Sequence, residues 1–377
     1  MTKTLKLVLI MLLLSRFYFI AITFISNFVN SDPGYLGSQV STGEPSLVWV
    51  WANMDGRHFV KIATQGYTGT NFAFFPLYPL LVTTVSRITA LTPIISGIFI
   101  STLAMVVSSI LLLKFIDIDK LKISKIETLF LFFFFPFSFI LTSVYADSLF
   151  LLFTIYSLYF ARSHRWLTAG CFAFFASLTR LTGIALVPVL AFEWWLQRKP
   201  VKINWATIRN YLKSGFIAPT LALLGFAAYP VYLQFQFNNW RLFQISMSAW
   251  KQDQLVLLPQ VFFRYFKIAT SVAPDTLVYW VAMLEMMSFI LYFLLAIYVY
   301  RKIRASYGLF MMIVLLLVTF TGTFAGTPRY LAHLFPAFLG LAYLFHKHPR
   351  LRYLYYPASI ILGIVLTAFF VAGRFIS

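Results

Sequence analysis

Long apolar runs, separated by short polar or basic segments, make up most of this chain. The first run covers about residues 7–28. The later runs lie at about 73–91, 94–115, 128–145, 148–162, 166–179, 183–196, 215–235, 277–299, 307–325, 330–346 and 353–372. A helix that crosses a bilayer needs roughly 20 apolar residues, and several of these runs are shorter. The pattern predicts an all-α polytopic membrane protein, with residues 1–377 as a single domain and about 10–11 membrane helices, some of them short or broken.

The composition supports a membrane protein and excludes a soluble one. Of the 377 residues, 60% are hydrophobic and only 11% are charged. A soluble domain carries about 25% charged residues, so this much apolar surface requires the bilayer as its solvent. The net charge of +19 fits basic cytoplasmic loops beside anionic lipid head groups. Membrane lipids are therefore expected partners, nucleic acid is not, and the lone Cys171 excludes a disulfide framework.

The positions of lysine and arginine predict the orientation of the chain. Basic clusters occur at residues 3–6, 114–125, 162–165, 198–213, 301–304 and 347–352. By the positive-inside rule these segments face the cytoplasm. The two long polar loops, at about 29–72 and 236–276, then face the opposite side. The residue types that carry chemistry collect on that extracytoplasmic side.

Two features of the first 125 residues affect the predicted membrane topology. Arg16 interrupts the first apolar run and no small-residue cleavage site ends it, which favours an uncleaved first helix over a signal peptide. Two full crossings between residues 73 and 115 would place the lysines of 114–125 outside. Either the segment at 74–79 does not cross the membrane, or this lysine loop breaks the positive-inside rule.

The most informative segment is residues 51–79, WANMDGRHFVKIATQGYTGTNFAFFPLYP. It brings Asp55, Arg57 and His58 together in a chain that has only 11 acidic residues. Residues 58–65 have helical spacing and Gly66 is a stop signal. We expect a short helix there, carried by the first long loop and lying along the membrane surface.

The three charged residues of this segment each have two interpretations. As a general base, Asp55 would take the hydroxyl proton of an acceptor during an inverting glycosyl transfer; as a helix cap it would only satisfy backbone N–H groups. Arg57 and His58 either contact a donor phosphate or sugar, or solvate the surface helix. Asp55 and His58 alone are a weak metal signal, so no metal site is predicted and a need for a divalent cation stays open.

Three further charged positions lie at the ends of apolar runs. Asp147 lies in SVYADS and is either a second acidic residue of the site or a helix N-cap. Arg180, in LTRLTG, and Arg329, in GTPRY, are phosphate candidates, because a fixed guanidinium can bind a departing phosphate bidentately. The alternative for both arginines is snorkelling to lipid head groups.

The second long loop adds aromatic candidates. Trp240, Arg241 and Trp250 either contact a sugar or anchor the loop at the membrane interface. Arg16 and Glu285 are charges inside predicted spans, and each marks a cavity or a partner without a specific assignment. No nucleotide-binding motif occurs in a loop large enough for a nucleotide sugar, which favours a lipid-linked donor presented within the membrane.

The motifs WANMDGRHF, IATQGY, FFPLYP, SVYADS, LTRLTG and TPRY occur in this order. Together they resemble the GPI mannosyltransferase II (PIG-V-like) family of the glycosyltransferase C superfamily. The first three motifs are specific, and the later ones are short. This chain has Tyr-Ala-Asp where the family usually has Tyr-Ser-Glu, and its match around Trp250 is partial.

The resemblance implies a GT-C-like helix bundle that transfers a sugar, mannose in this family, with inversion. The donor would be a polyprenyl-phosphate sugar and the acceptor an extracytoplasmic glycan, lipid or protein. Asp55 would be the base, Asp147 would assist it, and Arg180, Arg329 and the adjacent Tyr330 would bind the donor. The membrane would be the plasma membrane in a prokaryote and the endoplasmic reticulum in a eukaryote. A transporter or flippase for lipid-linked saccharides is the alternative, although no convincing internal repeat supports it.

Overall fold

A computed structural model describes the chain except residues 1–2, 30–42, 199–204, 206–214 and 377. Within the described residues the secondary structure is entirely helical. The first half contains α1 (Lys3–Val29), α2 (Ser46–Trp49), η1 (Val50–Ala52), α3 (Asp55–Gln65), η2 (Gly69–Ala73), α4 (Leu77–Thr89), α5 (Pro93–Ile118), α6 (Lys125–Phe133), η3 (Ser138–Thr142), α7 (Asp147–Arg162), α8 (Trp166–Thr179), η4 (Leu181–Ala185) and α9 (Leu186–Arg198). The second half contains α11 (Ile217–Phe237), α12 (Leu242–Met247), η6 (Ser248–Trp250), α13 (Leu258–Ser271), α14 (Leu277–Lys302), α15 (Ala305–Thr319), α16 (Thr327–Tyr330), η7 (Leu331–His333), α17 (Phe335–Lys347) and α18 (Leu351–Val371).

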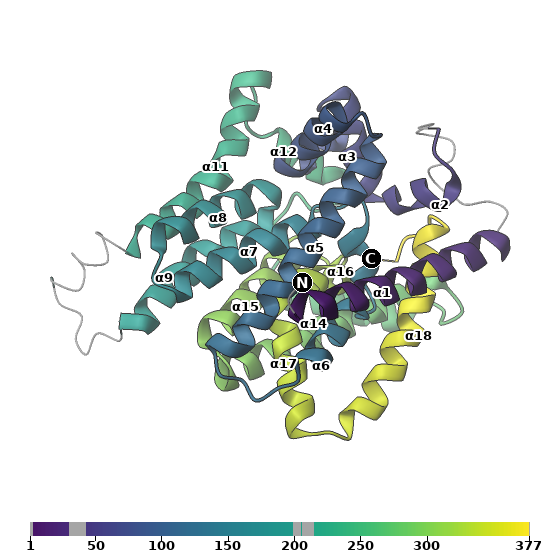
Figure 1. Cartoon of the computed structure of the whole chain (residues 1–377). Helices are drawn as coiled ribbons and strands as arrows, with labels where there is room; N and C mark the ends of the chain where they lie inside the picture. Colours follow the sequence, from purple (N-terminus) through teal and green to yellow (C-terminus); the bar gives the residue numbers. More distant parts are fainter. Residues whose placement is uncertain (1–2, 30–42, 199–204, 206–214, 377) are drawn as a thin grey trace.

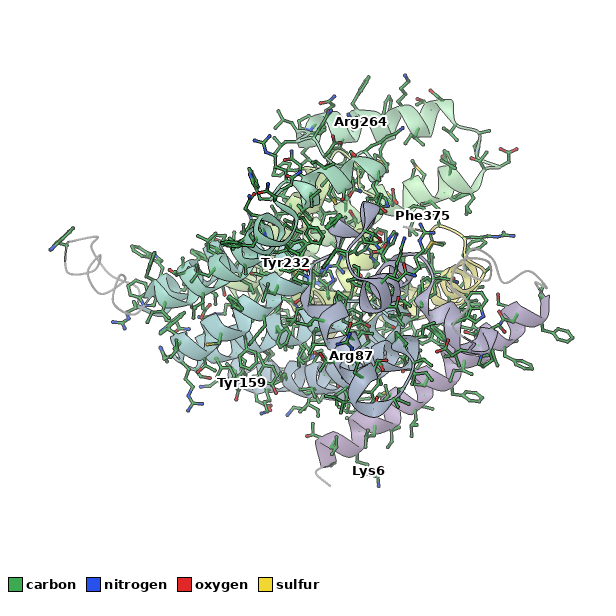
Figure 2. All side chains as sticks on the ribbon, turned by 90° about the horizontal axis from the view of Figure 1, so that it is seen from above. Lys6, Arg87, Tyr159, Tyr232, Arg264 and Phe375 are labelled. Carbon is green, nitrogen blue, oxygen red and sulfur yellow. The ribbon has the colours of Figure 1, made fainter. Side chains whose placement is uncertain are left out.

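Five of the described helices, α1, α5, α11, α14 and α18, are long and apolar enough to cross a membrane. The helices α8 and α15 are apolar but shorter. Large hydrophobic side chains such as Phe17, Phe235 and Phe263 are exposed. Figure 2 shows side chains projecting from the outer helices in one view. The predicted helical, polytopic membrane architecture with short and broken helices is confirmed.

Figure 1 shows α3, α4 and α12 gathered at one end of the bundle, and the α5–α6 and α17–α18 connections at the other. Between these ends, α7, α8 and α11 pack side by side. A Cβ at Gly225 of α11 would lie 2.3 Å from the carbonyl oxygen of Phe174. A glycine at this position therefore lets α8 and α11 approach closely, which is how helices commonly associate in membranes.

Two apolar runs are interrupted. The run at 128–145 is not one helix: α6 ends at Phe133, and Pro136 cannot continue it because proline lacks the backbone N–H. The predicted break in LTRLTG is confirmed, since α8 ends at Thr179 and Arg180 adopts an extended backbone (φ −154°, ψ 149°). The turn is tight, because a Cβ at Gly183 would lie 2.5 Å from the Cα of Ser177.

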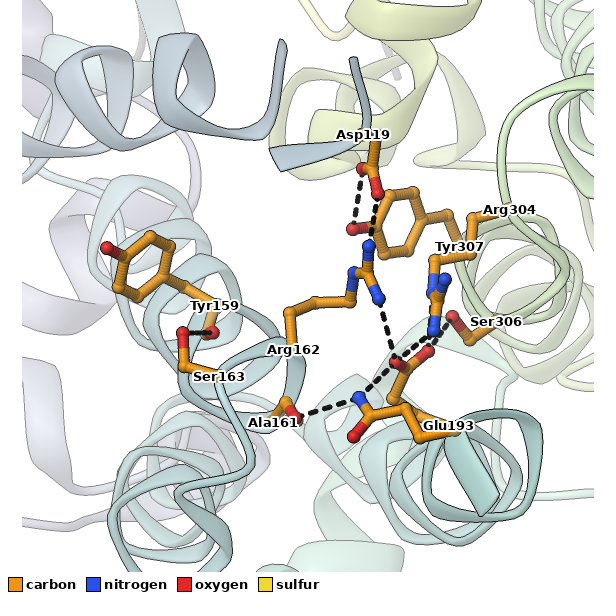
Figure 3. Close-up of polar contacts among 10 residues, drawn as sticks. Asp119, Tyr159, Ala161, Arg162, Ser163, Glu193, Arg304, Ser306 and Tyr307 are labelled. Atoms are coloured by element: carbon orange, nitrogen blue, oxygen red, sulfur yellow. Dashed lines mark hydrogen bonds and ion pairs between the residues drawn. The ribbon is translucent and has the colours of Figure 1, made fainter. Parts of the chain in front are cut away.

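A network of ion pairs includes Asp119, in the α5–α6 connection, and so lies at the end of the bundle away from α3. Figure 3 shows its polar contacts. Arg162 donates from Nη2 to Asp119 (2.6 Å) and lies 3.7 Å from Glu193. Arg304 donates from Nε to Oε2 of Glu193 (2.8 Å) and from Nη2 to Oε1 (2.5 Å). Tyr307 donates to the other oxygen of Asp119 (2.9 Å). The ends of α5, α7, α9 and α15 are therefore held by paired charges.

Replacing Glu193 with alanine is expected to lower the free energy of unfolding by about 3 kcal/mol, because it leaves the largely buried Arg304 guanidinium without its carboxylate partner. The Glu193 side chain is fully buried. Unfolding of the purified protein in detergent measures this effect. Asp117→Ala is the control, since Asp117 forms an ion pair with Lys125 but is 64% exposed, and an exposed pair contributes at most about 1 kcal/mol. Equal losses in the two variants would contradict the structural role of the network.

Candidate active site

The start of α3 fixes the position of Asp55. The preceding Asn53 is buried and donates from Nδ2 to the carbonyl oxygen of Phe370 in α18 (2.8 Å). Met54 has a left-handed φ of 58° with ψ −117°, a conformation that costs about 1–3 kcal/mol in a residue other than glycine and is held only by its surroundings. Met54 occupies the N-cap position and no side chain caps α3. The capping interpretation of Asp55 is therefore wrong, and its carboxylate is available for other contacts.

Asp55 forms an ion pair with Arg329, which lies 274 residues away in the sequence. Nη1 of Arg329 donates to Oδ2 of Asp55 at 2.7 Å. The guanidinium lies over the rings of Tyr145 (5.6 Å) and Tyr330 (5.3 Å). The hydroxyl of Tyr145 donates to the carbonyl oxygen of Asn53 (2.9 Å) and accepts the backbone N–H of Asp55 (3.2 Å). Tyr145 thus holds both the acid and its cationic partner.

Five of the predicted site residues line one cavity of about 190 Å³: Asp55, Arg180, Trp250, Arg329 and Tyr330. They come from the start of α3, the break after α8, the end of η6 and the short helix α16. Among the described residues that line the cavity, only Asp55 carries a carboxylate. The cavity therefore presents one acid and two guanidinium groups.

The rest of the wall is largely apolar. The Phe74 ring lies 6.0 Å from the Trp250 ring, and Gln252 follows Trp250 by two residues. The helix α15 contributes Leu317 and Val318. Such a surface suits a ligand with a polar head and an apolar body. The described residues contain no group of three or more His, Cys, Asp or Glu that could hold a metal ion.

Asp147 lies behind the cavity wall and does not line it. Its side chain is fully buried, accepts a hydrogen bond from Nη1 of Arg180 at Oδ2 (2.5 Å) and lies 3.0 Å from Nδ1 of His333 at Oδ1. No side chain caps α7, so the capping interpretation of Asp147 is also wrong. The hydrogen bond of Asp147 to the cavity lining goes to Arg180, whose guanidinium also lies 4.7 Å from the Tyr330 ring.

His58 and Arg57 support the wall from outside. His58 donates from Nδ1 to Oδ1 of Asn71 (2.6 Å) and accepts from Nε of Arg57 (3.3 Å). Its ring stacks on Phe74 (4.7 Å) and contacts Trp250 edge-on (5.8 Å). Burial lowers the pKa of His58 below its usual value of 6.5, so the imidazole is neutral at pH 7. Neither His58 nor Arg57 lines the cavity, and His58 instead orients two aromatic residues that do.

The remaining predicted residues lie elsewhere. Trp240 is 53% exposed, and the Arg241 guanidinium lies over its ring at 5.1 Å. Neither lines the cavity. Of the two charges inside predicted spans, Arg16 lies over the rings of Phe19 and Trp51, and Glu285 accepts a hydrogen bond from Tyr265 (2.5 Å).

Sequence reasoning missed two residues of the site, Tyr145 and His333. Both belong to or adjoin motifs that were recognised, SVYADS and TPRY. A tyrosine two residues before Asp147 and a histidine four residues after Arg329 are signals that could have found them.

The fold and the cavity define an integral-membrane protein with a charged site at one end of a helix bundle. The sequence model of the family described as Mannosyltransferase (PIG-V) matches residues 1–265, well over half of the chain. The chain belongs to this family, which makes it a membrane glycosyltransferase and confirms the resemblance found in its motifs. Arg329, Tyr330 and His333 lie beyond the matched residues, so only geometry links them to the site.

No curated protein matches the chain. Among solved structures, the chain is similar to a crystal structure of the Archaeoglobus fulgidus oligosaccharyltransferase tethered with an acceptor peptide containing the NVT sequon. The TM-score is 0.38 and the identity 12%, over 95% of this chain and 55% of that one. The chain thus spans about half the length of that enzyme, and a TM-score this low carries neither fold nor function from one protein to the other.

Proposed function

We propose that this glycosyltransferase moves a sugar, mannose by its family, from a polyprenyl-phosphate carrier to the hydroxyl group of an extracytoplasmic acceptor, with inversion. One observation carries the proposal: a single carboxylate, Asp55, faces the same cavity as the guanidinium groups of Arg180 and Arg329. A base and a phosphate site that face one cavity are what a single displacement from a sugar phosphate requires.

The proposed step is one displacement at the anomeric carbon. The acceptor oxygen forms its bond to this carbon while its proton moves to the Asp55 carboxylate. The bond between the anomeric carbon and the phosphate oxygen breaks, and its electron pair leaves with the polyprenyl phosphate. A retaining double displacement would need a second carboxylate about 5–5.5 Å from the first, and Asp147 lies outside the cavity.

The arginines would stabilise the charge that develops on the phosphate. Asp55 engages Nη1 of Arg329, whose Nε is buried without a hydrogen-bond partner in the described part of the chain. A phosphate that takes over this guanidinium would free the Asp55 carboxylate to act as a base, because both anions use the same donors. Donor binding and activation of the base would then be one event.

The cavity wall also suits the rest of the donor. The exposed face of Trp250, held by Phe74 and His58, would stack against the sugar. Leu317 and Val318 of α15 would contact the first isoprene units of the carrier. A soluble nucleotide offers nothing for this apolar side of the cavity.

The extracytoplasmic location rests on the two ends of the bundle. The helix α7 runs from Asp147 beside the cavity to Arg162 in the ion-pair network, and α15 runs from Arg304 in that network to Val318 in the cavity wall. The cavity and the basic segments are therefore at opposite ends. By the positive-inside rule the basic end is cytoplasmic.

The length of α4 supports the first of the two explanations for the lysine loop, that the segment at 74–79 does not cross the membrane. This helix has 13 residues, about 20 Å, whereas the hydrocarbon core is about 30 Å thick. It packs on α3 and α5 at the cavity end. If α4 does not cross, α5 begins on the cavity side and delivers residues 114–125 to the cytoplasm.

A donor screen with purified protein tests the proposal. We expect mannose transfer from a polyprenyl-phosphate mannose and none above background from a nucleotide mannose, since only the former matches a phosphate site with an apolar wall. The control is protein inactivated by heat. Transfer from the nucleotide sugar alone would reject the proposed donor. Movement of the intact lipid-linked sugar across vesicles without transfer would favour a flippase.

A further inference from the structure

One carboxylate, that of Asp147, connects the cavity to a histidine behind it. Oδ2 of Asp147 accepts from Nη1 of Arg180 (2.5 Å), and Oδ1 lies 3.0 Å from Nδ1 of His333. Asp147 and His333 are both fully buried, whereas Arg180 lies at the cavity surface. The three side chains form a chain of contacts that leads inward from the proposed phosphate site.

The surroundings of His333 determine which of its nitrogens carries the proton. The ring lies edge-on to Phe150 (4.9 Å) and Tyr330 (5.5 Å). Nε2 is buried and has no hydrogen-bond partner among the described residues. A proton on Nε2 would be a buried donor without an acceptor, which is costly. The proton therefore belongs on Nδ1, where it is donated to Asp147 and the imidazole stays neutral.

His333 also belongs to the segment that carries the second arginine. It lies in η7, which continues directly from α16, and α16 contains Arg329 and Tyr330. The Tyr330 ring lies beneath both guanidinium groups, 4.7 Å from Arg180 and 5.3 Å from Arg329. The contact between His333 and Asp147 thus connects the α16–η7 segment, which carries Arg329, to the carboxylate that pairs with Arg180.

We propose that His333 is a positioning residue of the donor site: by donating Nδ1–H to Asp147 it fixes the carboxylate that orients Arg180, and it sets the spacing between Arg180 and Arg329. This role rests on the proposed function. A carboxylate held at one oxygen by Arg180 alone could rotate about its side-chain bonds, and the guanidinium would follow it. Held at both oxygens, it keeps the guanidinium aimed at one point of the cavity.

The experiment compares two substitutions at this position. His333→Phe keeps the ring but removes the donor, and His333→Asn places an amide N–H near the position of Nδ1. With a polyprenyl-phosphate mannose donor, we expect His333→Phe to raise the donor KM about tenfold or more, because a lost hydrogen bond to a charged group has about this effect. The acceptor KM should not change. His333→Asn should retain a donor KM near that of the wild type.

Controls separate this role from a structural one. His346→Phe changes an exposed histidine at the end of α17 and should leave both KM values unchanged. A general loss of folding in His333→Phe would raise both KM values or lower the amount of active enzyme, and His333→Asn would then show whether the N–H itself matters. A donor KM equal to the wild type in His333→Phe, or equally poor donor KM values in both variants, would overturn the proposal.

The wild-type protein separates this inference from the proposed function. If the wild type transfers no sugar from a polyprenyl phosphate, both fail. If the wild type transfers sugar and only the variant pattern differs, this inference alone fails.

Discussion

Replacing Asp55 with asparagine is expected to lower kcat for sugar transfer by about 10²–10⁴-fold, the usual contribution of a general base. The amide has nearly the shape of the carboxylate and can still accept a hydrogen bond from Arg329. It cannot take the acceptor proton, so the loss should fall on the chemical step. Initial rates at saturating donor and acceptor measure it directly.

The matched control for this substitution is Asp253→Asn. Asp253 is exposed, lies in the loop that follows Trp250 and does not line the cavity. Its variant should have the kcat of the wild type. Both variants should unfold at the temperature of the wild type, because the amide oxygen in Asp55→Asn can still accept a hydrogen bond from Nη1 of Arg329, and Asp253 is exposed. A kcat for Asp55→Asn within a few-fold of the wild type would remove Asp55 as the base.

Replacing Arg329 with alanine is expected to raise the donor KM about 100-fold or more, since the donor phosphate would lose its guanidinium partner and truncating one partner of a desolvated charge pair costs about 2–5 kcal/mol. Arg329→Lys should recover only part of this loss, because an ammonium cannot bind a phosphate bidentately as a guanidinium does. Donor titrations at a fixed acceptor concentration give both values.

Arg241→Ala is the control for the arginine. Arg241 was also a predicted site residue, but its guanidinium lies over Trp240 outside the cavity. We expect its variant to keep the donor KM of the wild type. A donor KM raised as much by Arg241→Ala as by Arg329→Ala would show that the phosphate is bound elsewhere.

Motif order in the sequence predicted several of the residues that meet in the cavity, but not how they pair. Asp55, Arg180 and Arg329 each lie in a short motif at the end of an apolar run, and such ends gather at one membrane face. The ion pair between Asp55 and Arg329 joins residues 274 positions apart, and no local pattern encodes it. The same is true of the pair between Asp147 and Arg180, which moves Asp147 from the cavity to the layer behind it.

Closeness in the sequence did not predict which residues of the second long loop reach the cavity. Trp240, Arg241 and Trp250 are near neighbours along the chain, yet only Trp250 reaches the cavity. The intervening helix α12 separates them, and Lys251 turns the chain with a left-handed φ of 57°. Hydrophobicity likewise identified the apolar run at about 73–91 but did not show that the helix within it, α4, has only 13 residues.

The anomeric configuration of the product tests the central claim most directly. If one carboxylate, Asp55, activates the acceptor for a single displacement, the sugar must arrive with the configuration opposite to that of the polyprenyl-phosphate donor. NMR of the product formed by the wild-type protein distinguishes the two outcomes. Inversion is the predicted result. Retention of the donor configuration would contradict the account, because it would require a covalent intermediate on a nucleophile of the enzyme, whereas the account gives Asp55 the role of base.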